Sequence, residues 1–206
     1  MKKQWNAEEK LRFERALLEQ GATYIAGVDE VGRGPLAGPV VCAAVIMPFA
    51  ENELVIGVDD SKKLSEKKRE QLAEEIKAKA LCYTIIEIDE KTIDDVNILE
   101  ATKLGMKRAI ETLTITPDVV LTDGNMTIDI AHKQQSVVHG DALSYSIGAA
   151  SIIAKVYRDK LMDEYAKTYP QYGFEKNKGY GTAVHIQAIK EVGICPIHRK
   201  TFTKKF

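Results

Sequence analysis

The sequence predicts an α/β fold, with a mixed β-sheet flanked by helices and a helical C-terminal portion. Two apolar, β-branched segments at residues 24–30 and 39–47 come first and predict neighbouring strands. Segments of helical period then alternate with short apolar segments, which is typical of a sheet covered by helices. After Pro170, closely spaced glycines interrupt this pattern before one more helical segment.

The composition is that of an ordinary folded protein. The chain has 206 residues, of which 45% are hydrophobic and 29% charged, so we expect one domain over residues 1–206, in a monomer. The formal net charge of −1 argues against binding to nucleic acid by bulk charge alone. The three cysteines are far apart and predict free thiols in a reducing compartment. Because no signal sequence or membrane-length apolar run is present, we expect a cytoplasmic location without membrane contact.

The N-terminal half begins with a helix and a meander. We expect a short charged helix at residues 7–20, within an N-terminal helical segment of about residues 1–20. The strands at 24–30 and 39–47 follow. A third short strand around Leu54–Val58 would complete an antiparallel meander with them.

The remaining elements alternate in type. They are expected in this order: a helix with Ser65 as its N-cap, a strand at 81–88, a helix at 97–114, a strand at 118–123, an extended piece at 136–141, a long small-residue helix at 142–167 and a last helix near 182–192. Asn97 and Glu100 have the spacing of a capping box. On that helix, Leu99, Met106, Ile110 and Leu113 are expected on one face.

Several nucleotide-binding and catalytic motifs are excluded. The stretch "GRGPLAG" has the wrong glycine spacing for a dinucleotide fingerprint, and a strand follows it instead of a helix. The sequence contains no Walker A motif and no Gly-x-Ser-x-Gly elbow, and its four histidines lack the spacing of a zinc site.

Four acids occupy positions at the ends of expected elements. Asp29 and Glu30 end the first strand, Asp123 ends an apolar strand before Gly124, and Asp141 begins the long helix. Each also has a plain structural explanation: a solvated strand end for the first two, a turn residue for Asp123 and a helix N-cap for Asp141. If the four converge on one edge of the sheet, their repulsion requires cations. Carboxylate oxygens suit Mg²⁺ or Mn²⁺, and a pair of such ions is typical of phosphodiester cleavage.

Six blocks of sequence together resemble one family. They are "AGVDEVGRGPLAGPVV", "DDSKKLSEKKRE", "LTDGN", "VVHGDALSYSIGAASIIAKVYRD", "YPQYGFEKNKGYGT" and "GICPIHRKTF". In this order, from about residue 24 to residue 202, they resemble bacterial ribonuclease HII, the type 2 ribonuclease H. The related ribonuclease HIII carries an extra N-terminal domain and lacks the Gly-Arg-Gly element, so the twenty residues before the first strand favour HII.

The resemblance implies a fold and an activity. It implies one ribonuclease H-like catalytic domain over residues 1–206, whose helical portion at about 168–206 binds substrate. The implied activity is hydrolysis of RNA in RNA–DNA hybrids and nicking on the 5′ side of a single ribonucleotide embedded in duplex DNA, which leaves a 3′-hydroxyl and a 5′-phosphate. Two Mg²⁺ or Mn²⁺ ions are expected with substrate. The alternatives are another two-metal nuclease of the same fold and a non-catalytic hybrid-binding protein.

The resemblance also assigns residues. The family's catalytic and metal-binding carboxylates fall on Asp29, Glu30, Asp123 and Asp141. Its Gly-Arg-Gly element, which reads the RNA–DNA junction, falls on Gly32, Arg33 and Gly34, and its nucleotide-stacking tyrosine falls on Tyr180. Lys62, Lys63 and Lys178 are candidate phosphate contacts, although the first two could equally be solvated. Many relatives have histidine at Asn177 and alanine at Gly148, which bears on local packing.

Three local expectations remain. Neighbouring residues of a regular strand point to opposite faces, so the strand should end or bend at Glu30, or Glu30 should reach the ions from the far side or through its carbonyl. Asp29 is therefore the expected shared ligand. Asp159 could support the site, but an (i, i+4) pair with Lys155 is favoured. The terminal "KTFTKKF" is expected to be a frayed basic tail rather than a docking segment.

Overall fold

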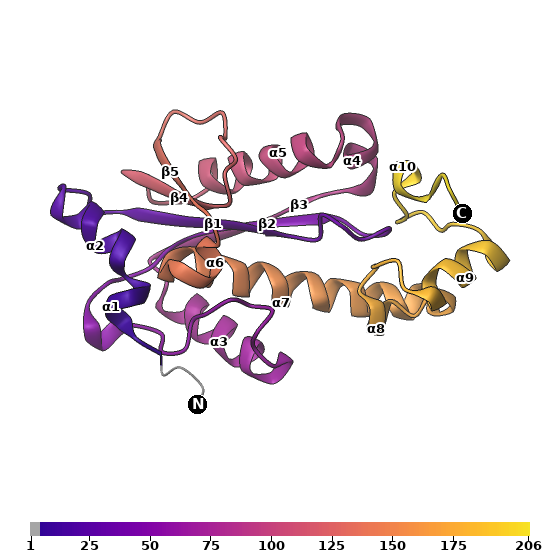
Figure 1. The fold of residues 1–206 in the computed structure, drawn as a ribbon, viewed down its shortest axis with the longest axis horizontal. Coiled ribbons are helices and arrows are strands. Elements are labelled where there is room, and N and C mark those ends of the chain that lie inside the picture. The colour runs from indigo at the N-terminus through magenta and orange to yellow at the C-terminus, as the bar shows by residue number, and fades with distance from the viewer. Residues whose placement is uncertain (1–4) are drawn as a thin grey trace.

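The fold has three layers, with a twisted sheet between two layers of helices (Figure 1). The structure is a computed structural model that describes residues 5–206, so the first residues of the expected N-terminal segment, 1–4, lie outside the described part. Helices α4 and α5 cover one face of the sheet, and α7 with α3 covers the other. Helices α8, α9 and α10 lie together at one end. The predicted mixed-sheet α/β class is confirmed.

The sheet has five strands in the order β3-β2-β1-β4-β5. Their bounds are β1 Ile25–Val31, β2 Val40–Ile46, β3 Cys82–Ile88, β4 Val119–Asp123 and β5 Lys133–Val137. Strands β1, β2 and β3 form an antiparallel meander, whereas β4 and β5 run parallel to β1. The carboxyl ends of β1, β4 and β5 therefore meet at one edge.

Ten α-helices complete the described residues. They are α1 Ala7–Lys10, α2 Arg12–Glu19, α3 Glu66–Lys79, α4 Glu90–Val96, α5 Ile98–Glu111, α6 Gly140–Leu143, α7 Tyr145–Thr168, α8 Phe174–Asn177, α9 Ala183–Val192 and α10 Lys200–Thr203. The predicted caps are present: Ser65 Oγ accepts from the amide of Lys68 at 3.4 Å, and Asn97 Oδ1 accepts from the amide of Leu99 at 2.9 Å. Met106 and Ile110 of α5 are buried, whereas Leu99 is 40% exposed and Leu113 lies beyond the end of the helix.

The third strand expected at Leu54–Val58 does not form. This segment follows the 3₁₀ turn Glu51–Glu53 and is irregular, and the meander is completed by β3. Leu54, Val55 and Val58 are nevertheless buried, packed in the cluster below α7. The amide of Val55 donates to the hydroxyl of Tyr145 at 2.9 Å. The apolar pattern thus reflects packing under a helix, which periodicity cannot distinguish from a short strand.

The N-terminal helix is broken and connects to the long helix. It divides at Leu11 into α1 and α2. Glu14 of α2 is fully buried, and its Oε1 accepts from Ser144 Oγ at 2.6 Å and from the amide of Ser146 at 2.9 Å. Burial raises the pKa of Glu14. This carboxylate lies at the N-terminal end of α7, where negative charge is favoured.

The small residues of α7 bring it against the sheet, as the sequence predicted. A Cβ on Gly27 of β1 would lie 2.1 Å from the carbonyl carbon of Ser146, so strand and helix meet at backbone distance. Gly148 is similarly enclosed, because its Cβ would meet the Asp141 carbonyl oxygen at 3.0 Å. Among the described residues, no helix is both long and apolar enough to cross a membrane.

Candidate active site

The four predicted acids converge on one edge of the sheet. Asp29 and Glu30 lie near the carboxyl end of β1, and Asp123 is the last residue of the parallel strand β4. Asp141 lies in α6, directly after the loop that leaves β5. The crossover connection between parallel strands places these ends together.

Asp29 is the most enclosed of the four. Its side chain faces α7, and the residue is 5% exposed. Its Oδ1 accepts from the amide of Glu30 at 2.7 Å. Burial raises the pKa of Asp29 well above its usual value, and the charges of Glu30 and Asp123 raise it further, partly opposed by a hydrogen bond from Ser151. A cation at this point would therefore be strongly favoured.

Glu30 lies on the opposite face of a regular strand. Pairing with β2 continues through Asp29–Ala43, Glu30–Cys42 and Val31–Val41, so the strand neither ends nor bends at Glu30. That alternative was wrong, because β2 pairs with β1 through its end. The carboxylate still lies near the others: burial raises the pKa of Glu30, Arg33 lowers it and Asp123 raises it again. An approach to the ions from the far side of the strand, or through the carbonyl of Glu30, stays a prediction.

Asp123 and Asp141 are joined through the turn between them. The amide of Gly140 donates to Asp123 Oδ1 at 2.6 Å. Asp141 is not the N-cap of the long helix, because that position is taken by Ser144, whose Oγ accepts from the amide of Ile147. Burial raises the pKa of Asp141, and the charges of Asp123 and Asp60 raise it further. Asp141 is thus available to a ligand rather than to the backbone of α7.

The carboxylate oxygens of the four acids are suitable ligands for a hard divalent cation, although their side chains are not arranged around a common point. Within residues 5–206, no three acidic, histidine or cysteine side chains are arranged so that they could hold a metal ion as they stand. Cationic groups of the protein lie near two of the acids: Arg33 Nη1 is 3.4 Å from Glu30 Oε1, and Lys62 Nζ is 3.9 Å from Asp141 Oδ2. The charge of Asp123 helps raise the pKa of Asp29, Glu30 and Asp141, and carboxylate oxygens match the preference of Mg²⁺ and Mn²⁺. Binding would require these side chains to move.

The Gly-Arg-Gly loop directly follows the acids. Gly32 has a φ of +91°, which favours glycine, whereas Gly34 does not need this freedom. The ring of Tyr180 lies beside the loop: a Cβ on Gly34 would be 3.7 Å from Tyr180 Cε1. Tyr180 is 44% exposed. The structure therefore brings the predicted junction-reading element and the predicted stacking residue together, next to Glu30.

The three predicted lysines differ in their surroundings. Lys62 is mostly exposed beside the acids; burial lowers its pKa, but the charges of Asp141 and Asp29 raise it overall. Lys63 pairs with Asp60 at 3.3 Å. The ammonium of Lys178 is engaged by Asp163. Only Lys62 thus lies among the predicted acids.

Asp159 has the partner that the sequence favoured, and the packing of Asn177 accounts for a difference from the family pattern. Asp159 pairs with Lys155 at 2.6 Å, the favoured (i, i+4) partner, and its other oxygen is 3.7 Å from Arg69. Asn177 is 8% exposed; its side chain donates to the carbonyl of Tyr172 at 2.7 Å and accepts from the amide of Gly179 at 2.8 Å. Asn177 therefore fits its packed position in the turn before Tyr180.

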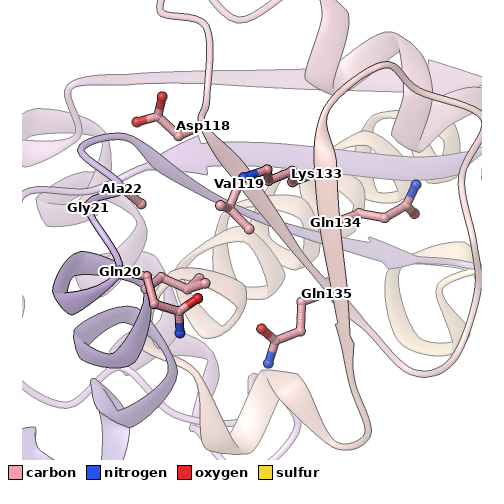
Figure 2. A pocket seen from close by; sticks show the side chains of 9 residues that line it. Gln20, Gly21, Ala22, Asp118, Val119, Lys133, Gln134 and Gln135 are labelled. Atoms are coloured by element: carbon pink, nitrogen blue, oxygen red, sulfur yellow. The ribbon is translucent and has the colours of Figure 1, made fainter.

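A separate pocket of about 470 Å³ lies at the other end of the parallel strands (Figure 2). It is lined by residues that precede β1, β4 and β5 or begin them, among them Ala22, Val119 and Lys133. None of the predicted site residues contributes to it. Ligands of open α/β sheets bind at the carboxyl ends of strands, so the acids and not this pocket mark the expected site.

Comparison with known proteins identifies the family of the chain. The sequence model of the Ribonuclease HII family matches residues 26–205. The chain belongs to the ribonuclease HII family. A ribonuclease HII from Ruminiclostridium cellulolyticum is 57% identical over 200 residues, which cover 97% of this chain and 77% of the relative. Membership makes the protein a type 2 ribonuclease H, an endoribonuclease that acts on RNA–DNA hybrids.

Solved structures of ribonuclease HII enzymes share the fold. The ribonuclease H2 of Pyrococcus horikoshii is 28% identical, with a TM-score of 0.75, and the match covers 89% of this chain and 96% of that one. The ribonuclease HII of Archaeoglobus fulgidus, solved in a complex with PCNA, is 26% identical with a TM-score of 0.75, over 87% and 94% of the two chains. The predicted ribonuclease H-like fold is confirmed.

Sequence reasoning missed the buried residues that contact Asp29 and the Gly-Arg-Gly loop of this ribonuclease HII site from the protein interior. Ser151 bonds to Ser61 at 3.0 Å and contributes to the pKa of Asp29. Arg158 and Arg199 are fully buried beneath the Gly-Arg-Gly loop. The signal for the arginines was present in the blocks "YRD" and "IHRKTF", but nothing in a single sequence distinguishes a buried arginine from a surface charge.

Proposed function

We propose that the protein is a divalent-metal-dependent endoribonuclease that also nicks duplex DNA on the 5′ side of a single embedded ribonucleotide, leaving a 3′-hydroxyl and a 5′-phosphate. The observation that carries this proposal is the convergence of four carboxylates directly beside the Gly-Arg-Gly loop and Tyr180. The first group supplies a site for cleavage. The second supplies a surface that can distinguish one sugar from the next.

In this proposal, Asp29, Glu30, Asp123 and Asp141 hold two Mg²⁺ or Mn²⁺ ions. Bound ions of this kind supply an activated water and neutralise charge on the leaving 3′-oxygen. Asp29 is the shared ligand, because it is the most enclosed acid and its charge is affected by two of the others. Lys62 contributes to binding a phosphate near Asp141.

Recognition of the ribonucleotide rests on the backbone of the Gly-Arg-Gly loop. The carbonyls of Gly32 and Arg33 point into the protein, toward Arg199. In a trans peptide the following N–H points the opposite way, so the amides of Arg33 and Gly34 face outward. Within the described residues neither amide donates a hydrogen bond. These amides can therefore approach the 2′-hydroxyl, the group that distinguishes RNA from DNA, while Tyr180 stacks on the next sugar.

Cleavage of a duplex that carries one ribonucleotide tests the proposal. We expect the wild-type protein with Mg²⁺ or Mn²⁺ to give one nick on the 5′ side of that nucleotide, with ends that a DNA polymerase can extend. Asp29→Asn should reduce the rate by a factor on the order of 10³ or more. Near-wild-type cleavage by the variant would refute the site. Equal cleavage of an all-DNA duplex would indicate a nuclease of another specificity, and binding without cleavage would indicate a hybrid-binding protein.

A single catalytic domain, a monomeric state and a cytoplasmic location remain predictions from the sequence. So do substrate contacts of Lys63 and Lys178, whose ammonium groups are engaged by Asp60 and Asp163. We include the helical portion at about 168–206 in the substrate-binding surface because it carries Tyr180.

A further inference from the structure

Two fully buried arginines lie behind the Gly-Arg-Gly loop. The side chains of Arg158 and Arg199 have no exposed surface. Within the described residues, neither forms a salt bridge with a carboxylate. Both instead donate to backbone carbonyls. Burying a guanidinium in this way is unfavourable unless its hydrogen bonds are satisfied, so these bonds determine what the residues do.

Arg199 holds the loop itself. Its Nη2 donates to the carbonyl of Gly32 at 2.6 Å, and its Nη1 donates to the carbonyl of Arg33 at 2.9 Å. Nε and Nη2 also donate to the carbonyl of Gly38, at 2.9 and 2.8 Å. A planar guanidinium can satisfy three carbonyls at once, which the single ammonium of lysine cannot do with the same geometry.

Arg158 joins this loop to the segment that carries Tyr180. Its Nη2 and Nε donate to the carbonyls of Ala37 and Pro39, at 3.1 and 3.0 Å. Its Nη1 donates to the carbonyl of Lys178 at 2.9 Å. The side chain also lies against Gly32, where a Cβ would come within 2.2 Å of Nε.

The segment before Tyr180 is held from three directions. The carbonyl of Lys178 accepts from Arg158, that of Gly179 accepts from the amide of Leu36 at 2.8 Å, and that of Tyr180 lies 2.9 Å from His185 Nδ1. Three consecutive carbonyls are thus engaged by different parts of the chain. The loop and the tyrosine are fixed to one another through this junction.

We propose that Arg199 is a positioning residue for ribonucleotide recognition: it turns the carbonyls of Gly32 and Arg33 inward and so holds the amides of Arg33 and Gly34 toward the substrate, while Arg158 fixes Tyr180 relative to them. This inference rests on the proposed function of the loop. Loss of Arg199 frees the loop to rotate its peptides, which removes discrimination for the 2′-hydroxyl. It leaves the acids on β1, β4 and α6 in place.

Both arginines remain charged at neutral pH. Burial lowers the pKa of Arg199, and the nearby charge of Arg158 lowers it further, to about 9; burial lowers that of Arg158 to about 10. Two positive charges under the loop add to its attraction for a phosphate backbone.

The experiment compares two substrates and one chemical rescue. Wild type and Arg199→Ala are assayed on a duplex with one ribonucleotide and on a continuous RNA–DNA hybrid, where many registers can be cut. We expect Arg199→Ala to lose about 10- to 100-fold more activity on the single ribonucleotide than on the hybrid, as for the loss of charged hydrogen bonds. Millimolar guanidinium should restore part of the loss on the single ribonucleotide.

Leu72→Ala is the matched control, because Leu72 is a fully buried apolar residue of α3 whose truncation removes packing but no hydrogen bond to the loop. It should lower the melting temperature, with equal effects on both substrates and no rescue. An unchanged substrate ratio in Arg199→Ala, or a lack of rescue, overturns the inference. If Arg199→Ala does not fold, Arg199→Lys decides. In that variant, the ratio of activity on the single ribonucleotide to activity on the hybrid must fall below the wild-type ratio. A ratio equal to that of wild type overturns the inference. If the wild type itself does not cut the single ribonucleotide, the proposed function is wrong and the inference falls with it.

Discussion

The Nε2 atoms of His185 and His198 lie 3.0 Å apart in the C-terminal portion. His185 Nδ1 is 2.9 Å from the carbonyl of Tyr180 and must donate to it, so His185 Nε2 accepts. His198 Nδ1 accepts from the amide of Cys195 at 2.9 Å, so His198 Nε2 donates. One neutral tautomer of each ring satisfies these three bonds. A second proton on either ring would leave two donors facing each other.

This pair predicts a loss of stability in weak acid. Burial and, to a smaller extent, the charge of His185 lower the pKa of His198 from 6.5 to about 4. Between these values the unfolded chain binds the proton and the folded chain does not, so the free energy of unfolding falls as the pH falls. The contribution is up to about 3 kcal/mol. Urea denaturation from pH 7 to pH 4 measures it.

His198→Gln should flatten this dependence relative to wild type. His139→Asn is the control, because His139 is exposed and Asn tolerates its φ of +57°. The control should retain the slope of the wild type. A slope that survives His198→Gln would assign the pH dependence to other groups, such as His185, whose pKa burial also lowers.

Asp29→Asn should stabilise the metal-free protein while it abolishes cleavage. The carboxylate of Asp29 is buried beside two other acids, whereas an amide carries no charge and keeps an oxygen for the amide of Glu30. We expect a gain of about 1 kcal/mol in the free energy of unfolding, measured in EDTA. Asp129→Asn, at a fully exposed acid, should change it little. A clear loss of stability in Asp29→Asn would contradict the repulsion described above.

The two glycines of the loop should differ when changed to alanine. Gly32→Ala forces a Cβ against Arg158 at a positive φ, so melting temperature and activity should both fall. Gly34→Ala meets only the ring of Tyr180, at 3.7 Å, so its melting temperature should stay near that of wild type. Its cleavage of a single ribonucleotide should still fall. Equal thermal losses in the two variants would show that the loop is not held as described.

Tyr180→Ala and Arg33→Ala should damage cleavage more than stability. Both side chains are well exposed, so little buried surface is lost. We expect melting temperatures within a few degrees of wild type and at least a tenfold loss of cleavage at a single ribonucleotide, about what a lost stacking contact removes. Tyr24→Ala, at an exposed tyrosine beyond the other end of β1, serves as control and should retain activity. Parallel losses of melting temperature and activity would argue against a recognition role.

The sequence alone predicted most of the layers and the meeting of the acids. Apolar runs at 24–30 and 118–123 indicated strands, and the parallel pairing of β1 with β4 brings Asp29 and Asp123 to one edge. The small residues of α7 predicted its close contact with the sheet. These features follow from local composition and from topology, which one sequence carries.

Contacts between residues far apart in the sequence could not be predicted in the same way. The segment Leu54–Val58 was expected to be a strand because a buried irregular segment under α7 has the same apolar content as a short strand. A bend in β1 at Glu30 was expected because a single sequence does not show that Asp123, at the end of β4, lies close enough to raise the pKa of Glu30. The roles of Arg158 and Arg199 depend on carbonyls more than one hundred residues away.

The bond between Arg199 and the carbonyl of Arg33 spans 166 positions of the chain. During synthesis, the loop therefore emerges from the ribosome long before the side chain that holds it. The acids of β1 and β4 can meet once residue 123 has emerged, but the loop reaches its held form only after residue 199 has followed. A nascent chain would thus bring the acids of β1 and β4 together before the loop is held. On the proposed function of the loop, selectivity would be the last property that translation confers.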